Sequence, residues 1–445
     1  MDTHDVSGAP TPDFAARRSE AFERLGDGAL VLPAAPLQYA SRDTERPYVP
    51  DRELFYVTGL TEPGTIAVLV GGEEPRLVVF ARDRDPDAEL WAGPRSGPEA
   101  AGERAGADEA RSLEDLPARL PELLAGVDRV HYRLGAGGEE VERLVRAALA
   151  RARARGPRTG SGPRGIVDPG ETLDDLRVVK DATELEAIRR ACDVTIRGHR
   201  AGARRIEPGV GEWAIEAAID GAFRSSGATR PGFDTIVGSG ENACVLHYVH
   251  NRDRVPEGGL VLVDAGAEID LYHGDVTRTY PASGRFSPRQ RDVYDLVEAA
   301  LRAGIEAVRP GETIGDVHAA ATRVLVDGLV ELGVLSGEVD GLLEQDAHKP
   351  FFPHQTSHWL GLDVHDPGDY ARAGASRVLE PGMVFTVEPG LYFRPGVADG
   401  QAAGFAGIGV RIEDDVAVTA DGRENLTAGL PTAAGDVEEL VGAGA

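Results

Sequence analysis

The first 155 residues alternate between short apolar runs and amphipathic segments. Segments 14–25 and 139–155 space their apolar residues as amphipathic helices do, and the second is rich in Arg. Short apolar runs bounded by turn residues predict buried strands, and they lie at 29–32, 54–59, 65–70 and 76–80. Because Gly71 and Gly72 separate the last two runs, we expect a hairpin there. Strands mixed with helices predict an α/β domain.

A stretch rich in Gly and Pro, 156–171, interrupts this pattern and is predicted to be a linker or a surface loop. We therefore expect an N-terminal α/β domain over 1–173 and a second domain over 174–445. Early in the second domain, Asp181 and Glu184 have the spacing of a capping box before a helix that runs to Arg205. Ser287, followed by Pro, predicts another helix start.

The second domain contains a faint internal duplication. Each copy has a helix, a turn ending in Pro-Gly and a second amphipathic helix, which we place at 212–225 and 315–332. An apolar strand ending in an acid follows, and then a second acid; these acids are Asp264 and Asp275 in the first copy, and Glu388 and Glu413 in the second. Pseudo-twofold packing of the two units would bring both acid pairs together at the centre.

The composition narrows the possible partners. The 445-residue length favours two domains, and 42% apolar with 27% charged residues fits a globular protein. The net charge of 47 − 74 = −27 argues against nucleic acid and against anionic membranes, because both attract cationic surfaces.

The cellular compartment is inferred from the cysteines and from apolar runs. For Cys192 and Cys244, two buried thiols in a reducing compartment are favoured over a single disulfide. Residues 1–24 lack the apolar core of a signal peptide, and no apolar run approaches the ~18 residues of a membrane span. We therefore expect a cytoplasmic enzyme.

Histidines are concentrated in one stretch, where His354, His358 and His365 lie within twelve positions of a chain that has 11 His. Each taken alone is better explained as a structural histidine. Each of the four acids of the duplication is explained alone as half of an ion pair with Arg or as part of a strand-end turn. Together they indicate a metal site, because an ionised carboxylate in an apolar run is costly unless it is paired or metal-bound.

The donor types predict the metal and the reaction. Four carboxylates and one imidazole are mainly hard oxygen donors, which suit Mn²⁺ better than thiophilic metals. Four negative charges match two divalent cations and leave room for a bridging hydroxide. Two such ions clamp the attacking oxygen and the oxygen of the scissile group. We therefore expect metal-assisted hydrolysis of an amide.

The chain resembles the pita-bread metallopeptidases, and most closely the aminopeptidase P (Xaa-Pro aminopeptidase) family. The motifs that carry the resemblance lie in the second domain at 237–248, 264–266, 274–279, 357–366, 387–392 and 407–415. The N-terminal half resembles the family more loosely, at 54–59 and 89–93. The resemblance implies a creatinase-like α/β N-terminal domain and an α+β pita-bread catalytic domain with pseudo-twofold duplication.

The resemblance also implies roles for the metal ligands. Asp264 and Asp275 would serve one metal and His358 and Glu388 the other, with Asp275 and Glu413 bridging. Glu388 would also accept a proton from the nucleophilic water.

Other groups would surround the substrate. His247 and His365 would steady the proline and the oxyanion of the tetrahedral intermediate. His354, Tyr392 and Arg411 would support the site, with Arg411 orienting the bridging carboxylates. Trp91 would reach the active site of a neighbouring subunit in a dimer or tetramer, although an ordinary core Trp explains it equally well.

Two positions depart from the family pattern, and several activities stay open. Gln355 stands where some relatives have Gly, and Phe233 where relatives can carry Tyr. The expected substrate is a peptide with proline at its second position, whose tertiary amide has no N–H. The main alternative is an Xaa-Pro dipeptidase (prolidase); a metal-free relative such as creatinase and a methionine aminopeptidase are further alternatives.

Overall fold

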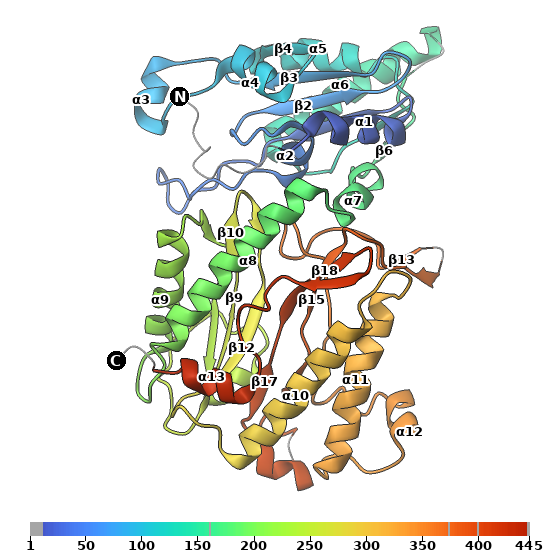
Figure 1. Cartoon of the computed structure of the whole chain (residues 1–445). Coiled ribbons are helices and arrows are strands. Elements are labelled where there is room, and N and C mark those ends of the chain that lie inside the picture. The colour runs from blue at the N-terminus through green and yellow to red at the C-terminus, as the bar shows by residue number, and fades with distance from the viewer. Residues whose placement is uncertain (1–11, 160–161, 373, 398–399, 443–445) are drawn as a thin grey trace. The chain divides into compact units, whose positions relative to one another are not determined.

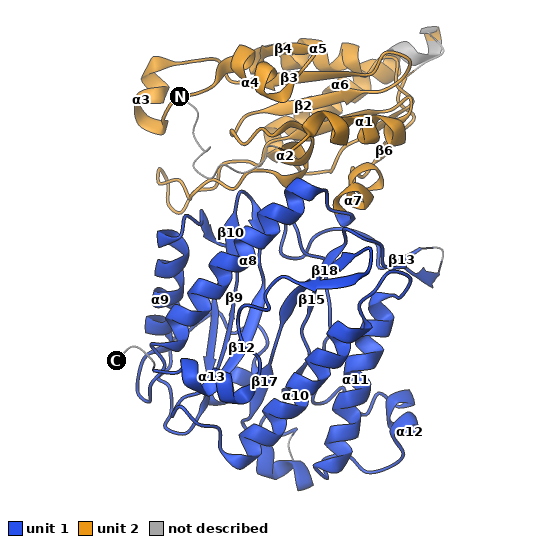
Figure 2. Ribbon diagram, in the orientation of Figure 1, with its two compact units in different colours: residues 1–9, 178–445 blue, residues 10–177 orange. Residues whose placement is uncertain are grey.

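The computed structural model describes residues 12–159, 162–372, 374–397 and 400–442, without the side chains of 155–157 and 159. Within this part of the chain the residues form two compact units, which divide between Arg177 and Val178 (Figures 1 and 2). Each unit is built around its own apolar core.

The N-terminal unit has a six-stranded mixed sheet in the order β4-β3-β2-β1-β5-β6. Antiparallel pairing joins β1 to β2 and β2 to β3, whereas the outer pairs are parallel. The strands are β1 (Ala29–Pro33), β2 (Ile66–Val70), β3 (Arg76–Ala81), β4 (Glu109–Ser112), β5 (Arg129–His131) and β6 (Gly165–Val167). The hairpin expected at Gly71-Gly72 is therefore confirmed.

Seven helices accompany this sheet among the described residues. They are α1 (Phe14–Leu25), α2 (Arg52–Thr58), α3 (Pro86–Ala92), α4 (Gly97–Ala105), α5 (Leu116–Leu123), α6 (Gly138–Thr159) and α7 (Gly170–Val178). The predicted helix at 14–25 is confirmed, and the one expected at 139–155 is longer by a few residues.

The strand predicted at 54–59 is wrong, because this apolar run lies in helix α2. Capping decides the outcome: the Asp51 side chain accepts a hydrogen bond from Leu54 N at 2.8 Å, and Gly59 ends the helix with φ 72°. The linker predicted at 156–171 is also wrong in part. This stretch contains the end of α6 and the strand β6, which pairs with β5 in the sheet.

The second unit contains two long helix pairs and antiparallel sheets. The helices are α8 (Ala182–Ala203), α9 (Glu212–Ser225), α10 (Pro288–Ala307), α11 (Ile314–Glu331), α12 (Val339–Glu344) and α13 (Ala434–Leu440). The predicted capping box at Asp181 and Glu184 is present, and Ser287 and Gln290 form a second one at the start of α10. Both helix starts are therefore confirmed.

The strands of this unit fall into short groups. The first half has β7 (Arg230–Pro231), β8 (Ile236–Ser239), β9 (Leu260–Ala265), β10 (Ala267–Ile269), β11 (Tyr272–His273) and β12 (Val276–Pro281). The second half has β13 (Ala371–Arg372), β14 (Ala375–Ser376), β15 (Val384–Val387), β16 (Gly390–Tyr392), β17 (Gly409–Arg411), β18 (Asp414–Thr419) and β19 (Gly422–Asn425).

The expected duplication is visible in this arrangement. In the first half, α8 and α9 pack beside the sheet β12-β9-β8; in the second, α10 lies with α11 beside β15 and β17 (Figure 1). Antiparallel pairing joins β9 to β12 and β15 to β18 in the same way. A bridge between Thr277 and Glu413 connects the two halves where the acids lie.

Two further expectations concern cysteines and membranes. Cys192 and Cys244 are buried free thiols, so the predicted absence of a disulfide between them is confirmed. Among the described helices, none combines the length and the apolar character that crossing a bilayer requires.

Candidate metal centre

The four acids occupy matching places in the two halves. Asp264 lies near the end of β9 and Asp275 directly precedes β12, while Glu388 directly follows β15 and Glu413 directly precedes β18. Gly266 allows a close backbone approach between the first two acids, because a Cβ at this position would collide with the carbonyl oxygen of Gly274. Strand ends in the middle of the unit thus present all four carboxylates.

Three of the expected ligands form a compact donor group. One ligand atom from each of Asp275, His358 and Glu413 lies within 4.8 Å of the others. The Nε2 atom of His358 is 3.4 Å from Asp275 Oδ2 and 3.8 Å from Glu388 Oε1. Asp264 stands beside this group, where its charge raises the pKa of Asp275.

Burial and mutual repulsion disfavour the ionised carboxylates. The pKa values of Asp275 and Glu413 lie well above their ordinary values, first because of burial and then because of neighbouring carboxylates. Burial likewise raises the pKa of Glu388, although the charges of His358 and Arg411 oppose that rise. A site that accumulates negative charge at this cost needs compensating cations.

The residues present fit divalent cations. The Oδ1 atoms of Asp264 and Asp275 are buried and have no hydrogen-bond partner among the described residues. Unpaired buried carboxylate oxygens are rare and call for an explanation such as an ion. Carboxylate oxygens with one imidazole are the donors that Mn²⁺ and similar ions prefer.

Arg411 organises the carboxylates from β17. Its guanidinium donates to Asp264 Oδ2 at 2.6 Å, to Thr277 Oγ1 at 3.1 Å and to the hydroxyl of Tyr392 at 3.0 Å. Thr277 in turn donates to Glu413 Oε2 at 2.6 Å. The guanidinium of Arg411 thus fixes the orientation of Asp264 directly and that of Glu413 through Thr277, so it acts on acids from both halves.

Two groups behind the carboxylates were missed by the sequence reasoning. Thr277 carries the hydrogen bond to Glu413, and its signal was a polar residue in a strand whose residues are all buried. Asp415 accepts from the backbone N of Asp275 at 2.9 Å and from the thiol of Cys192 at 3.2 Å. Burial raises the pKa of Asp415 to about 7.

The expected supporting histidine, His354, lies within the same site. Its Nε2 is 2.8 Å from the hydroxyl of Tyr392, and its Nδ1 is 3.7 Å from Glu388 Oε2. Burial, followed by the charge of Arg411, lowers the pKa of His354 to about 3. This imidazole is therefore neutral at physiological pH, and one of its nitrogens can accept a hydrogen bond.

The two histidines expected over the substrate are more exposed. The ring of His365 lies 4.3 Å from that of His358, centroid to centroid. Burial, then the charges of His358 and His247, lowers the pKa of His365, so His247 lies near this ring. A buried ion pair of 3.0 Å between Lys180 and Asp366 holds the segment that carries His358 and His365.

The remaining sequence features are placed as follows. Trp91 lies on α3 of the N-terminal unit with 89% of its surface exposed, so it is not a core residue within that unit. Phe233 borders Gly266 between Asp264 and Asp275, because a Cβ on that glycine would lie 2.9 Å from the ring. The carbonyl oxygen of Gln355 is 2.8 Å from His354 Nδ1.

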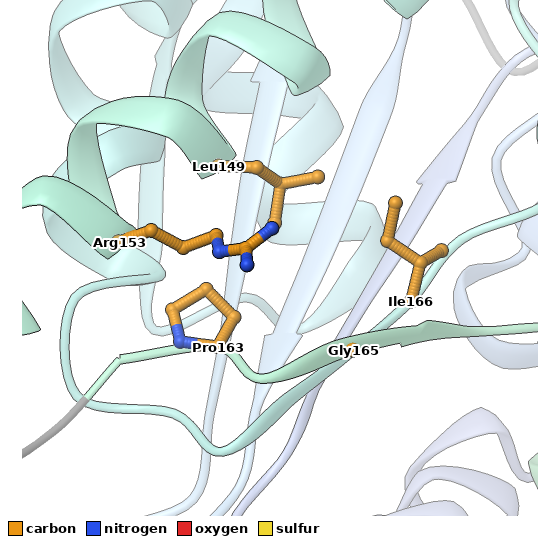
Figure 3. A pocket seen from close by; sticks show the side chains of 5 residues that line it. All are labelled: Leu149, Arg153, Pro163, Gly165 and Ile166. Carbon is orange, nitrogen blue, oxygen red and sulfur yellow. The ribbon is translucent and has the colours of Figure 1, made fainter.

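A cavity in the N-terminal unit is unrelated to this chemistry. It is lined by Leu149, Arg153, Pro163, Gly165 and Ile166, between α6 and β6 (Figure 3). None of the expected metal ligands lines it.

Family models match both parts of the chain. Residues 186–420 match metallopeptidase family M24, and residues 14–132 match the N-terminal domain of aminopeptidase P. The Xaa-Pro aminopeptidase of Escherichia coli (strain K12) is 40% identical over 433 residues, which cover 96% of this chain and 97% of that protein.

Solved structures agree with these matches. The structure of Pseudomonas aeruginosa aminopeptidase PepP aligns with a TM-score of 0.92 at 41% identity, covering 98% of this chain and 99% of that one. Proline aminopeptidase P II from Yersinia pestis aligns with a TM-score of 0.91 at 40% identity, covering 96% and 98%. The predicted fold class, an α/β domain followed by a duplicated pita-bread domain, is confirmed.

Proposed function

This chain belongs to metallopeptidase family M24 and carries an aminopeptidase P N-terminal domain, and from this premise we propose that it is an Xaa-Pro aminopeptidase. The reaction would release the first residue of a peptide whose second residue is proline. The donor group of Asp275, His358 and Glu413 carries the proposal, because these side chains could hold a metal ion within the residues that match family M24.

We propose a dinuclear centre with Mn²⁺ as the preferred ion. Asp264, Asp275, His358, Glu388 and Glu413 would hold the ions. The unpaired oxygens of Asp264 and Asp275 support this assignment, as do the raised pKa values of Asp275 and Glu413. When bound, two divalent cations lower the pKa of a shared water and polarise the scissile carbonyl.

The chain's own groups would move the protons. Glu388 would take the proton from the attacking water, because its carboxylate lies beside the proposed ligand His358, 3.8 Å from Nε2. His354 would remain neutral beside Glu388 and keep Tyr392 in place through their 2.8 Å hydrogen bond. Arg411 would hold Asp264 at a fixed angle to the other ligands.

His247 and His365 would contact the substrate. Both are exposed, unlike the carboxylates, and the charge of His247 helps to lower the pKa of His354 and that of His365. From these positions they would donate hydrogen bonds to the developing oxyanion and border the proline ring. Because the Xaa-Pro amide has no N–H, the site needs no acceptor for one.

The N-terminal unit would complete the site from another subunit. Trp91 is exposed on a helix that buries none of its residues within the unit, as expected for a side chain that packs elsewhere. We propose a dimer or tetramer in which Trp91 borders a neighbouring subunit's substrate.

The decisive assay compares peptides in the presence of Mn²⁺, Zn²⁺ and chelator. Release of the first residue from Xaa-Pro-Yaa, but not from Xaa-Ala-Yaa, is expected with Mn²⁺ and not with chelator. Cleavage of only the Xaa-Pro dipeptide would make the chain a prolidase. Metal-independent activity, or none on either peptide, would overturn the proposal.

A further inference from the structure

A buried carboxylate outside the metal centre has all its acceptor capacity in use. Glu212 is the first residue of α9 and has no exposed surface. Its Oε1 accepts from Ser239 N at 2.8 Å, from Ser239 Oγ at 2.7 Å and from Asn242 Nδ2 at 3.1 Å. Its Oε2 accepts from the hydroxyl of Tyr248 at 3.0 Å and from Asp253 N at 2.9 Å.

The partners of Glu212 lie on both sides of His247 in the sequence. Ser239 and Asn242 precede that histidine, whereas Tyr248 and Asp253 follow it. The backbone adds to the closure, because Glu212 N donates to Asp253 O at 2.9 Å. One side chain thus ties together the beginning and the end of the segment 239–253, which we call the His247 loop.

Apolar contacts alone do not fix this loop. Ala243, Cys244 and Tyr248 pack into a small apolar cluster, whereas Val245 and Val249 are 51% and 42% exposed. Apolar burial is non-directional, so it holds the loop down without setting its register. Hydrogen bonds to an ionised acceptor are short, directional and stronger than those between neutral groups.

We infer that Glu212 is a positioning residue that sets the place of His247 over the substrate. It acts through the five hydrogen bonds that close the His247 loop, and none of the residues that donate them is a candidate metal ligand. The role of His247 in this inference rests on the proposed function, whereas the effect of Glu212 on the loop does not.

The first test measures the loop itself, with metal-loaded full-length protein. In Glu212→Gln, an NH₂ group replaces one carboxylate oxygen and faces the donor groups of the loop. It cannot accept their hydrogen bonds, so the bonds at one end of the loop are lost. Amide hydrogen exchange over 239–253 is expected to rise, while exchange in β9 and β12 stays unchanged. The control is Glu438→Gln, since that partly buried carboxylate accepts from Phe286 N and Arg285, and neither of these partners lies in the loop.

The second test measures coupling to His247. On Xaa-Pro-Yaa, Glu212→Gln is expected to lower kcat/KM by about tenfold or more with metal content unchanged, because a small displacement of a positioned group is costly. In the His247→Ala background the same change is expected to cost less than about twofold, since the positioned group is already missing. Tyr248→Phe, a milder change that removes one hydroxyl, is expected to show the same coupling if Glu212→Gln folds poorly.

The outcomes separate the two proposals. If wild-type protein fails to cleave Xaa-Pro-Yaa, the proposed function falls, and hydrogen exchange still decides the role of Glu212. Unchanged exchange over 239–253, or losses of activity that are equal with and without His247, would overturn the inference. Increased exchange together with coupled losses would support it.

Discussion

At the scale of single residues, the site is a concentration of carboxylates that the protein alone does not neutralise. Arg411 forms an ion pair with one of these carboxylates, with its guanidinium nitrogen 2.6 Å from Asp264 Oδ2. Asp275, Glu388 and Glu413 are left with raised pKa values. Metal binding therefore has to displace protons, which makes both affinity and stability depend on pH.

The metal-free protein should lose stability as pH rises. Carboxyl groups with folded-state pKa values above the unfolded value of about 4 bind more protons when folded, so the free energy of unfolding falls with rising pH. Denaturation between about pH 5 and pH 8 should show this slope without metal and a smaller slope with Mn²⁺. Glu413→Gln, which removes one of these groups, should reduce the metal-free slope. Equal metal-free slopes for wild type and Glu413→Gln would refute this interpretation.

The fork of Arg411 should matter beyond its charge. Arg411→Lys keeps the cation but cannot donate to Asp264, Thr277 and Tyr392 together, so metal affinity and kcat/KM should each fall by about 10- to 100-fold. Metal titration and peptide kinetics measure the two losses. The control Arg285→Lys alters an exposed ion pair and should leave both values unchanged. Wild-type affinity in Arg411→Lys would contradict the role of the fork.

At the scale of elements, capped helices and bounded apolar runs were predictable from local sequence. Asp181 and Ser287 predicted the starts of their helices, because each capping box joins residues that are only three positions apart in the sequence. The run at 54–59 predicts a strand because its four apolar residues are consecutive and have no distinctive period, whereas the caps at Asp51 and Gly59 favour the helix. The edge strand β6 was missed since its pairing with β5 is a tertiary contact.

In the candidate site, too, some residues were predictable from local sequence and others only from tertiary contacts. The acids stood out because an acid in an apolar run conflicts with its surroundings. Thr277 and Asp415 were not identified as partners, because their roles arise only when β12 meets the start of β18. Long-range register of this kind is not encoded in a local pattern.

The hairpin between Asp264 and Asp275 should not tolerate a methyl group. Gly266→Ala would place Cβ against the carbonyl of Gly274 and the ring of Phe233, so we expect lost metal affinity and destabilisation by more than about 2 kcal/mol. Gly221→Ala is the matched control, because its Cβ meets nothing within 4 Å in helix α9. That change should stabilise the protein by up to ~1 kcal/mol. Similar denaturation midpoints for both variants would contradict the close approach at Gly266.

At the scale of the whole molecule, the chain combines a duplicated catalytic unit with an N-terminal unit that has its own core. The duplication explains why the expected ligands converge from distant segments: each half places a pair of acids at equivalent strand ends. The N-terminal unit supplies none of the expected metal ligands. Its proposed contribution is Trp91, through assembly with other subunits.

Trp91→Ala should therefore separate substrate contact from metal binding. We expect kcat/KM on Xaa-Pro-Yaa to fall by about tenfold, since aromatic contacts at assembled sites are often energetically dominant. Metal content should not change. Leu134→Ala, which truncates another exposed apolar side chain of the same unit, should have no effect. Light scattering should give a dimer or tetramer for wild type; a monomer with full activity would exclude the proposed role.

The most direct test of the account is a Mn²⁺ titration of metal-free protein, with release of the first residue of Xaa-Pro-Yaa followed in the same samples. Activity should be absent at the start and reach its maximum near about two ions per chain. Asp275→Asn should bind fewer ions and remain inactive. Full activity without metal, or wild-type activity and stoichiometry in Asp275→Asn, would contradict the proposal that these carboxylates hold the ions that drive hydrolysis.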